Sequence, residues 1–146
     1  MMQTNNSDLS TELTYTRFDR MVEKYPRNTA VVYLGERFSY HRLYDLSARF
    51  AGALKDMGVC KGDRVMIYVS NCIQWVIAFI GIQKLGAVIV PVSPIYTSHE
   101  LDYMVRDSGA ETLICLDTNF CYVKEVMNPV MTYNAPCAKL GRRLTP

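Results

Sequence analysis

Hydrophobic and polar positions form alternating blocks along residues 64–117, and these blocks predict the fold class. Three short runs rich in β-branched residues have the length of strands, and a helix-length pattern fills each gap between them. The runs are RVMIYV at 64–69, AVIVPV at 87–92 and ETLICL at 111–116. Strands that alternate with helices pair in parallel through right-handed crossovers, and near-continuous apolar strands suit a sheet covered on both faces. The pattern therefore predicts an α/β protein with a partial parallel βαβαβ sheet.

Polar and glycine residues mark where the two crossover helices begin and end. Ser70 or Asn71 is expected to cap the first helix, because a short side-chain oxygen accepts a backbone N–H that the first turn leaves unpaired. Thr97 and Glu100 have the spacing of a capping box, which begins the second helix. Glycines end both helices, since glycine enters the left-handed conformation without steric cost. The expected ends are Gly86 and Gly109.

Three elements are predicted before the first of these strands. Residues 11–25 form a helix with one apolar face, and Pro26 stops it. The runs AVVYL and RFSY form a β-hairpin around Gly35. Ser39 then caps a long amphipathic helix that runs to residue 57 and ends at Gly58.

The pattern divides the chain into three parts. We expect a disordered N-terminus at residues 1–10 and a partial domain at 11–127, which ends with a short helix beginning near Asp117. Residues 128–146 carry prolines and no period, and are expected to be a disordered, aberrant tail.

Composition excludes several classes of protein. A chain of 146 residues with 49% hydrophobic residues, 21% charged residues and a net charge of +2 has the composition of a soluble globular domain. Its basic cluster at Lys139, Arg142 and Arg143 is too small for a phosphate-contacting surface, so no nucleic-acid partner is expected.

The cysteines and the apolar stretches of the sequence indicate the cellular compartment of the protein. The five cysteines show no CxxC spacing, which argues against a disulfide framework and a zinc site. The apolar stretch 72–82 is too short to cross a bilayer, so no transmembrane segment is expected. The first residues show no secretion signal, and a cytoplasmic location is therefore predicted.

A search for chemistry yields no catalytic, cofactor-binding or metal-binding residue. Nucleotide, metalloprotease and hydrolase motifs are absent from the sequence. The residues considered were the two histidines, three acidic residues without a partnered nucleophile or base, three apolar residues of the first crossover helix, and one loop tyrosine. They are His41, His99, Asp102, Asp107, Glu111, Trp75, Phe79, Ile82 and Tyr96. Tyr96 lies where parallel sheets bind ligands, but packing is the favoured interpretation even there.

Five segments, in a fixed order, carry a family resemblance. They are FSYxxL at 38–43, MGVCKGDRV at 57–65, Ser70-Asn71, KLGAVIVPVSPIYT at 84–97 and ELDYMVRDSGA at 100–110. Together they resemble the opening of the adenylate-forming (AMP-binding) acyl-CoA synthetases, and in particular the long-chain fatty-acid–CoA ligases. The resemblance covers Phe18 to Val126 and implies an incomplete N-terminal subdomain of the adenylate-forming fold.

The resemblance also implies what an intact enzyme does. Such an enzyme joins a fatty acid to ATP as an acyl-adenylate, with Mg, and transfers the acyl group to coenzyme A. The phosphate loop ending in Pro-Lys-Gly and the C-terminal catalytic lysine lie downstream in the family and do not occur in residues 1–146. No family catalytic residue can be carried onto this chain, and we expect the chain alone to be inactive and to hold no cofactor.

The end of the resemblance after Val126 suggests a truncated or frameshifted synthetase. Its partners would then be the missing remainder of the enzyme, or further copies that associate through an open sheet edge. Two alternatives stay open. One is a stand-alone α/β module that binds a nucleotide or acyl group, and the other is an interaction subunit completed by a separately encoded remainder.

Overall fold

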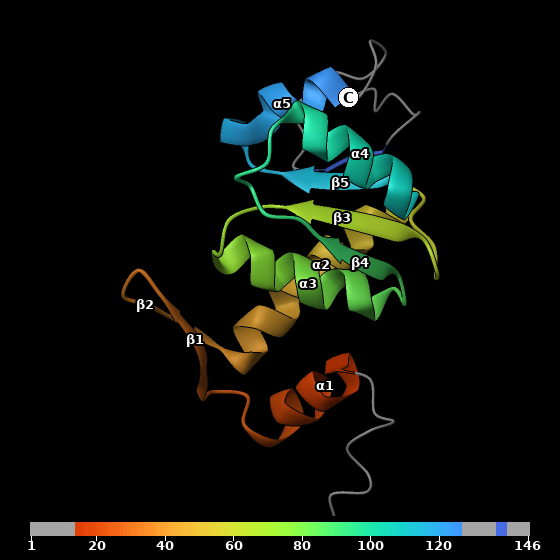
Figure 1. The fold of residues 1–146 in the computed structure, drawn as a ribbon. Coiled ribbons are helices and arrows are strands. Elements are labelled where there is room, and N and C mark those ends of the chain that lie inside the picture. The colour runs from red at the N-terminus through yellow and green to blue at the C-terminus, as the bar shows by residue number, and fades with distance from the viewer. Residues whose placement is uncertain (1–13, 127–136, 140–146) are drawn as a thin grey trace, which may run out of the picture. The chain divides into compact units, whose positions relative to one another are not determined.

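The structure is a computed structural model, and it describes residues 14–126 and 137–139. The chain divides into two compact units, Met1–Leu46 and Ser47–Pro146, and the boundary falls inside helix α2. The bounds of the described elements are α1 Thr14–Lys24, β1 Thr29–Tyr33, β2 Glu36–Ser39, α2 Tyr40–Asp56, β3 Arg64–Tyr68, α3 Ile73–Lys84, β4 Val88–Pro91, α4 Ser98–Ser108, β5 Thr112–Cys115, the 3-10 turn η2 Asp117–Asn119, α5 Phe120–Val126 and β6 Cys137–Lys139 (Figure 1).

The first unit contains the predicted helix and hairpin. Helix α1 covers residues 14–24 of the expected helix, and β1 and β2 pair as an antiparallel hairpin. At the hairpin tip Leu34 and Gly35 both have positive φ, 49° and 83°, which fits the left-handed backbone of a tight hairpin turn. The Oγ of Ser39 accepts the N–H of Arg42 at 3.2 Å, so the predicted cap of α2 is confirmed.

The second unit is a four-stranded sheet with the order β4-β3-β5-β6. Strands β4, β3 and β5 are parallel, with Val65 beside Ile89 on one side and beside Thr112 on the other. The predicted α/β class and its parallel βαβαβ core are confirmed. β6 pairs antiparallel with β5.

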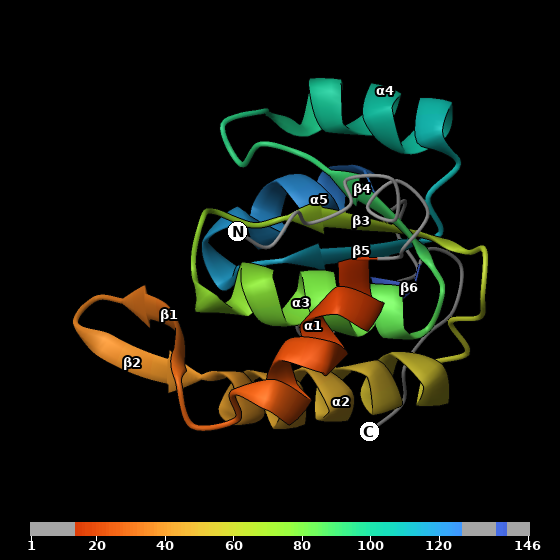
Figure 2. The same cartoon turned by 90° about the horizontal axis from the view of Figure 1, so that it is seen from below.

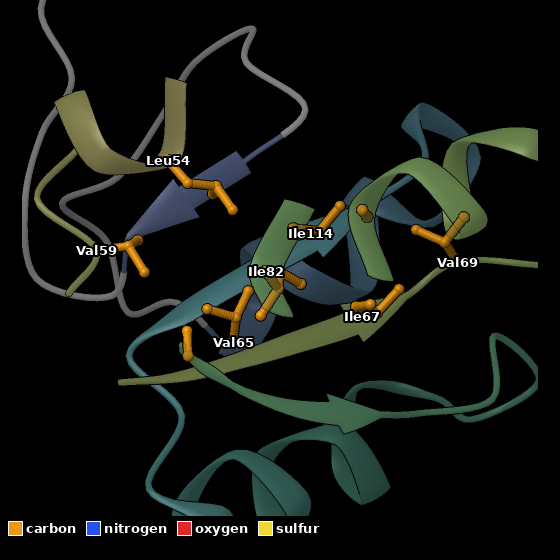
Figure 3. Close-up of a cluster of buried hydrophobic side chains, with 9 residues drawn as sticks. Leu54, Val59, Val65, Ile67, Val69, Ile82 and Ile114 are labelled. Atoms are coloured by element: carbon orange, nitrogen blue, oxygen red, sulfur yellow. The ribbon is translucent and has the colours of Figure 1, made fainter. Parts of the chain in front are cut away.

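Helices cover both faces of this sheet. Side chains along β3 alternate between the two faces and are apolar on each, so each face needs a covering helix. Val65, Ile67 and Val69 enter a buried apolar cluster with residues of the end of α2 and of α3 (Figure 3). Met66 and Tyr68 point to the opposite face and pack with residues of α4 and α5. Every β3 residue after Arg64 is buried, which explains its nearly unbroken apolar sequence.

Helix ends follow the glycine predictions. The N–H of Gly58 donates to the Lys55 carbonyl at 2.8 Å, and the N–H of Val59 donates to the Leu54 carbonyl at 2.9 Å. This pair of bonds defines a Schellman motif, and Gly86 ends α3 with the same pattern. Gly109 ends α4 with a left-handed φ of 64°.

The predicted start of the first crossover helix is wrong. Helix α3 begins at Ile73, and Cys72 occupies the N-cap position without a side-chain cap. Ser70 and Asn71 are exposed and lie two residues and one residue before the N-cap. The position of this start is therefore decided by how the α3 apolar residues reach the sheet, since no local cap defines it. The capping box of Thr97 and Glu100 at the start of α4 is confirmed.

The terminal predictions fall mostly outside the described part of the chain. The expected disorder of residues 1–10 concerns residues that the structure does not describe, and so does most of segment 128–146. Within that segment, however, Cys137–Lys139 forms strand β6, because the outer edge of β5 offers free backbone partners. No helix among residues 14–126 combines the length and apolar character needed to cross a bilayer.

Candidate functional site

The carboxyl ends of β3 and β5 lie side by side, and the chain leaves these two strands toward opposite faces of the sheet. The chain leaves β3 toward α3, whose buried residues pack on one face, and leaves β5 toward α5, whose Val123 packs on the other. Figure 2 shows α3 on one side of the two strands and α5 on the other. Open α/β sheets bind ligands at such a switch point, so this edge is the candidate site.

Three loops border this edge. They are residues 69–72 after β3, 92–97 after β4 and 116–119 after β5. Their side chains include exposed polar groups at Ser70, Asn71 and Thr118. The loops contain no lysine, arginine or histidine, and Asp117 is their one charged residue.

Two side chains hold the loop 92–97 in place, one from strand β3 and one from the 3-10 turn η2. Tyr68, at the end of β3, is completely buried, and its hydroxyl donates to the main-chain carbonyl of Tyr96. Asn119, in the segment after β5, donates its Nδ2 hydrogen to the carbonyl of Pro94 at 3.1 Å. The two carbonyls flank Ile95, whose side chain is 80% exposed. The loop is thus clamped on both sides of an outward-facing apolar residue.

Tyr96 is the candidate that sequence analysis singled out in this loop. It is partly buried and packs against the apolar cluster of α4 and α5. Its carbonyl, rather than its ring, makes the polar contact with Tyr68. The geometry fits the packing interpretation that the sequence favoured.

The remaining candidates lie outside these three loops. The Nδ1 of His41 is 3.3 Å from Asp45 on the exposed surface of α2, and Asp102 forms an i,i+4 ion pair with Arg106 at 2.9 Å. Trp75 and Phe79 stack on each other with ring centroids 5.1 Å apart. The other four occupy exposed or core positions: His99, Asp107 and Glu111 are exposed, and Ile82 is completely buried.

Sequence analysis did not identify Tyr68 or Asn119. Tyr68 carries a recognisable signal, because it places one polar atom in a strand whose other residues after Arg64 are apolar, and a buried hydroxyl needs a partner. Asn119 carries no comparable signal. Its partner carbonyl lies 25 residues away in the chain, and only the folded sheet brings the two together.

Two titratable groups near this edge have shifted pKa values. Burial raises the pKa of the Cys115 thiol to about 11, and the nearby Asp117 carboxylate adds to the effect because it disfavours a thiolate. The Thr97 hydroxyl, followed by the Thr97 backbone N–H, lowers the pKa of Glu100. These shifts describe an inert thiol and a helix cap, neither of which is an acid or base poised for catalysis.

The side chains at this edge do not suit the magnesium nucleotide that the resemblance implies for an intact enzyme. A bound triphosphate is stabilised by cationic side chains, and the three loops supply none and carry a single carboxylate. Among the described residues, no group of three or more His, Cys, Asp or Glu side chains is arranged to hold a metal ion.

Comparison with known proteins identifies the family. The model of the AMP-binding enzyme family matches residues 18–141. The chain therefore belongs to this family, the adenylate-forming enzymes. The match continues past Val126, where the sequence pattern alone placed the end of the resemblance.

Individual relatives agree with this membership. The chain is 35% identical over 97 residues to a long-chain-fatty-acid–CoA ligase of Bacillus subtilis. The aligned region covers 66% of this chain and 17% of the relative. It is 32% identical over 130 residues to a long-chain-fatty-acid–CoA ligase of Escherichia coli. Here the aligned region covers 88% of this chain and 23% of the relative. The chain thus spans less than a quarter of the length of these two curated relatives.

A solved structure supports the fold. The fatty acyl CoA synthetase of Mycobacterium tuberculosis superposes with a TM-score of 0.72 at 27% identity, over 76% of this chain and 22% of that chain.

Proposed function

We propose that this chain forms the N-terminal scaffold of an ATP-dependent fatty-acid–CoA ligase and that residues 1–146 alone do not catalyse ligation. The intact enzyme would use ATP, Mg and coenzyme A. Two relatives named long-chain-fatty-acid–CoA ligases support the substrate class. More than three quarters of the Escherichia coli relative lies outside the match, since the chain covers 23% of it.

The carboxyl edge of the sheet carries the argument for inactivity. Transfer of an adenylyl group builds negative charge that must be stabilised by cations or oriented donors. The loops 69–72, 92–97 and 116–119 have no basic side chain, and Asp117 would repel a phosphate. The clamped loop 92–97 acts as a structural border of the sheet.

An ATP–pyrophosphate exchange assay with palmitate tests the proposal. The purified chain should show no fatty-acid-dependent exchange above background, while the full-length Escherichia coli relative, assayed in parallel, supplies the positive control. Substantial palmitate-dependent exchange by the 146-residue chain would overturn the proposed inactivity. To test the scaffold role, the matching segment of the Escherichia coli relative is replaced by this chain, and the hybrid should retain palmitate-dependent exchange.

A stand-alone binding module is the second candidate, and the switch point between β3 and β5 is the observation that favours it. Titration of the labelled chain with ATP, and separately with palmitate, would distinguish the two. The scaffold proposal expects no saturable NMR shifts at Ser70, Asn71 or the loop 92–97. Saturable shifts confined to these loops would support the module instead.

The remainder of the enzyme is the proposed partner of this chain. If it is separately encoded, a second polypeptide that carries the phosphate loop should copurify with the chain from its native cell. We also propose a cytoplasmic location, because Cys60, Cys72 and Cys115 are free thiols and such thiols persist in a reducing compartment. Fractionation that recovers the chain with the membranes would contradict this location.

A further inference from the structure

Backbone groups along β4 alternate between the side that faces β3 and the opposite side, which we call the open side because no strand among the described residues pairs with it. The N–H of Val88 donates to the Asp63 carbonyl at 2.8 Å, and the N–H of Val92 donates to the Ile67 carbonyl at 2.9 Å. Because this direction alternates with a period of two residues, Val90 also faces β3. Ile89 and Pro91 therefore face the open side.

The open side of β4 offers one backbone donor to an added strand. Pro91 has no N–H. Ala87, the preceding residue on this side, already donates its N–H to the Ile82 carbonyl at 3.2 Å. The N–H of Ile89 is the one donor left within and directly before β4. An added strand would find carbonyl acceptors along β4, but β4 would not offer it the regular series of N–H donors that a β-ladder needs.

The other side of the sheet behaves differently. β5 pairs with β3 on one side and with β6 on the other, with Thr112 opposite Lys139 and Ile114 opposite Cys137. Its first three residues are completely or almost completely buried, whereas Val88 and Pro91 at the ends of β4 are exposed. The outer side of β5 is thus paired with a further strand, β6, whereas β4 has the features of a solvent-exposed edge strand.

We propose that Pro91 closes the β4 edge against strand addition, so that a second copy of this chain cannot extend the sheet there. The sequence led us to expect association through an open strand edge, and the backbone geometry argues that β4 is not that edge. Natural sheets protect exposed edges with proline at positions whose N–H would point outward. This inference concerns the edge itself and is independent of the proposed ligase function.

Amide exchange of the unmodified chain gives the first test. Measured by NMR, the Ile89 N–H should exchange at least about tenfold faster than those of Val88 and Val90, because only the latter two point toward β3 and the Asp63 that precedes it. This ratio should not change when the protein concentration is raised. Protection of Ile89 equal to that of Val90, or protection that increases with concentration, would overturn the proposal.

The substitution Pro91→Val gives the second test, because it restores a donor on the open side. Sedimentation equilibrium should show that this variant self-associates at concentrations about tenfold lower than the unmodified chain, with new protection of Ile89. Pro94→Val is the matched control, since it makes the same chemical change in a loop, and it should sediment like the unmodified chain. Identical sedimentation of the Pro91→Val variant and the unmodified chain would refute the proposal. If Pro91→Val does not fold, the exchange test on the unmodified chain still decides.

Discussion

The hydroxyl of Tyr68 donates to the main-chain carbonyl of Tyr96, and this bond joins the end of β3 to the loop after β4 across 28 residues of sequence. Tyr68 is completely buried, so its hydroxyl has no access to bulk water as an alternative partner. The bond therefore connects the core of the second unit to the border of its carboxyl edge.

Tyr68→Phe should remove this bond and keep the ring packing. We expect the free energy of unfolding to fall by about 1 kcal/mol, the usual net value of one hydrogen bond. Amides of the loop 92–97 should exchange faster, because one of the two clamps is lost. Urea unfolding and hydrogen exchange measure the two effects.

Tyr103→Phe is the matched control, because the Tyr103 side chain is 69% exposed. It should change the unfolding free energy by less than about 0.5 kcal/mol. Equal behaviour of the Tyr68→Phe and Tyr103→Phe variants would show that the Tyr68 hydroxyl does not hold the loop.

Asn119→Ala should loosen the same loop from the other side, since it removes the 3.1 Å bond to the Pro94 carbonyl. The two clamps act on carbonyls that flank one residue, so their losses should not simply add. A double-mutant cycle with Tyr68→Phe should give an interaction energy of about 0.5 kcal/mol or more. Strict additivity in urea unfolding would mean that the two bonds act independently.

Gly81→Ala should destabilise the protein, because helix α3 passes very close to the middle of α2. A Cβ at this position would lie 3.0 Å from the Ser47 carbonyl oxygen and 3.0 Å from Cδ1 of Phe50. Backbone cannot move aside cheaply, and we expect a loss of about 1–3 kcal/mol. Thermal or urea unfolding measures the change.

Gly52→Ala is the matched control for this substitution. Gly52 lies inside α2, and a Cβ there would meet nothing within 4 Å. Alanine should stabilise the helix by about 0.5–1 kcal/mol through its higher helix propensity. A stabilising Gly81→Ala would contradict the close approach of the two helices.

The raised pKa of Cys115, about 11, predicts slow alkylation. At pH 8 its thiolate fraction is small, so iodoacetamide should modify Cys115 much more slowly than the exposed Cys60 and Cys121. In denaturant the rates should become similar, which separates the folded environment from the intrinsic reactivity. Mass spectrometry of tryptic peptides measures each site, and rapid labelling of folded Cys115 at pH 8 would contradict the shift.

The same shift has a consequence for stability at high pH. The folded-state pKa of Cys115 is raised, so the unfolded chain loses this proton first as the pH increases. The contribution to stability is complete below the unfolded-state pKa and disappears as the pH rises through about 11. Cys115→Ala should remove this part of the pH dependence in denaturant titrations between about pH 8 and pH 11.

Local sequence signals predicted the elements well wherever a short-range interaction defines them. Ser39, Gly58 and Gly109 cap or end helices through bonds to residues within five positions. Ser70 and Asn71 failed as predicted caps, since α3 begins at Ile73 without a side-chain cap. In that case the packing of the helix on the sheet outweighs a preference worth about 1 kcal/mol.

The sequence by itself determined the α/β class, because apolar runs of strand length and helix period are local properties of the chain. It also determined the family, through ordered motifs that the family match over residues 18–141 confirms. Only the tertiary structure decided the strand order β4-β3-β5-β6, the clamp of Tyr68 and Asn119 on one loop, and the outward position of Pro91. These features depend on contacts between groups that lie far apart in the sequence. The register of the sheet determines which of these groups meet, and no short stretch of sequence specifies it.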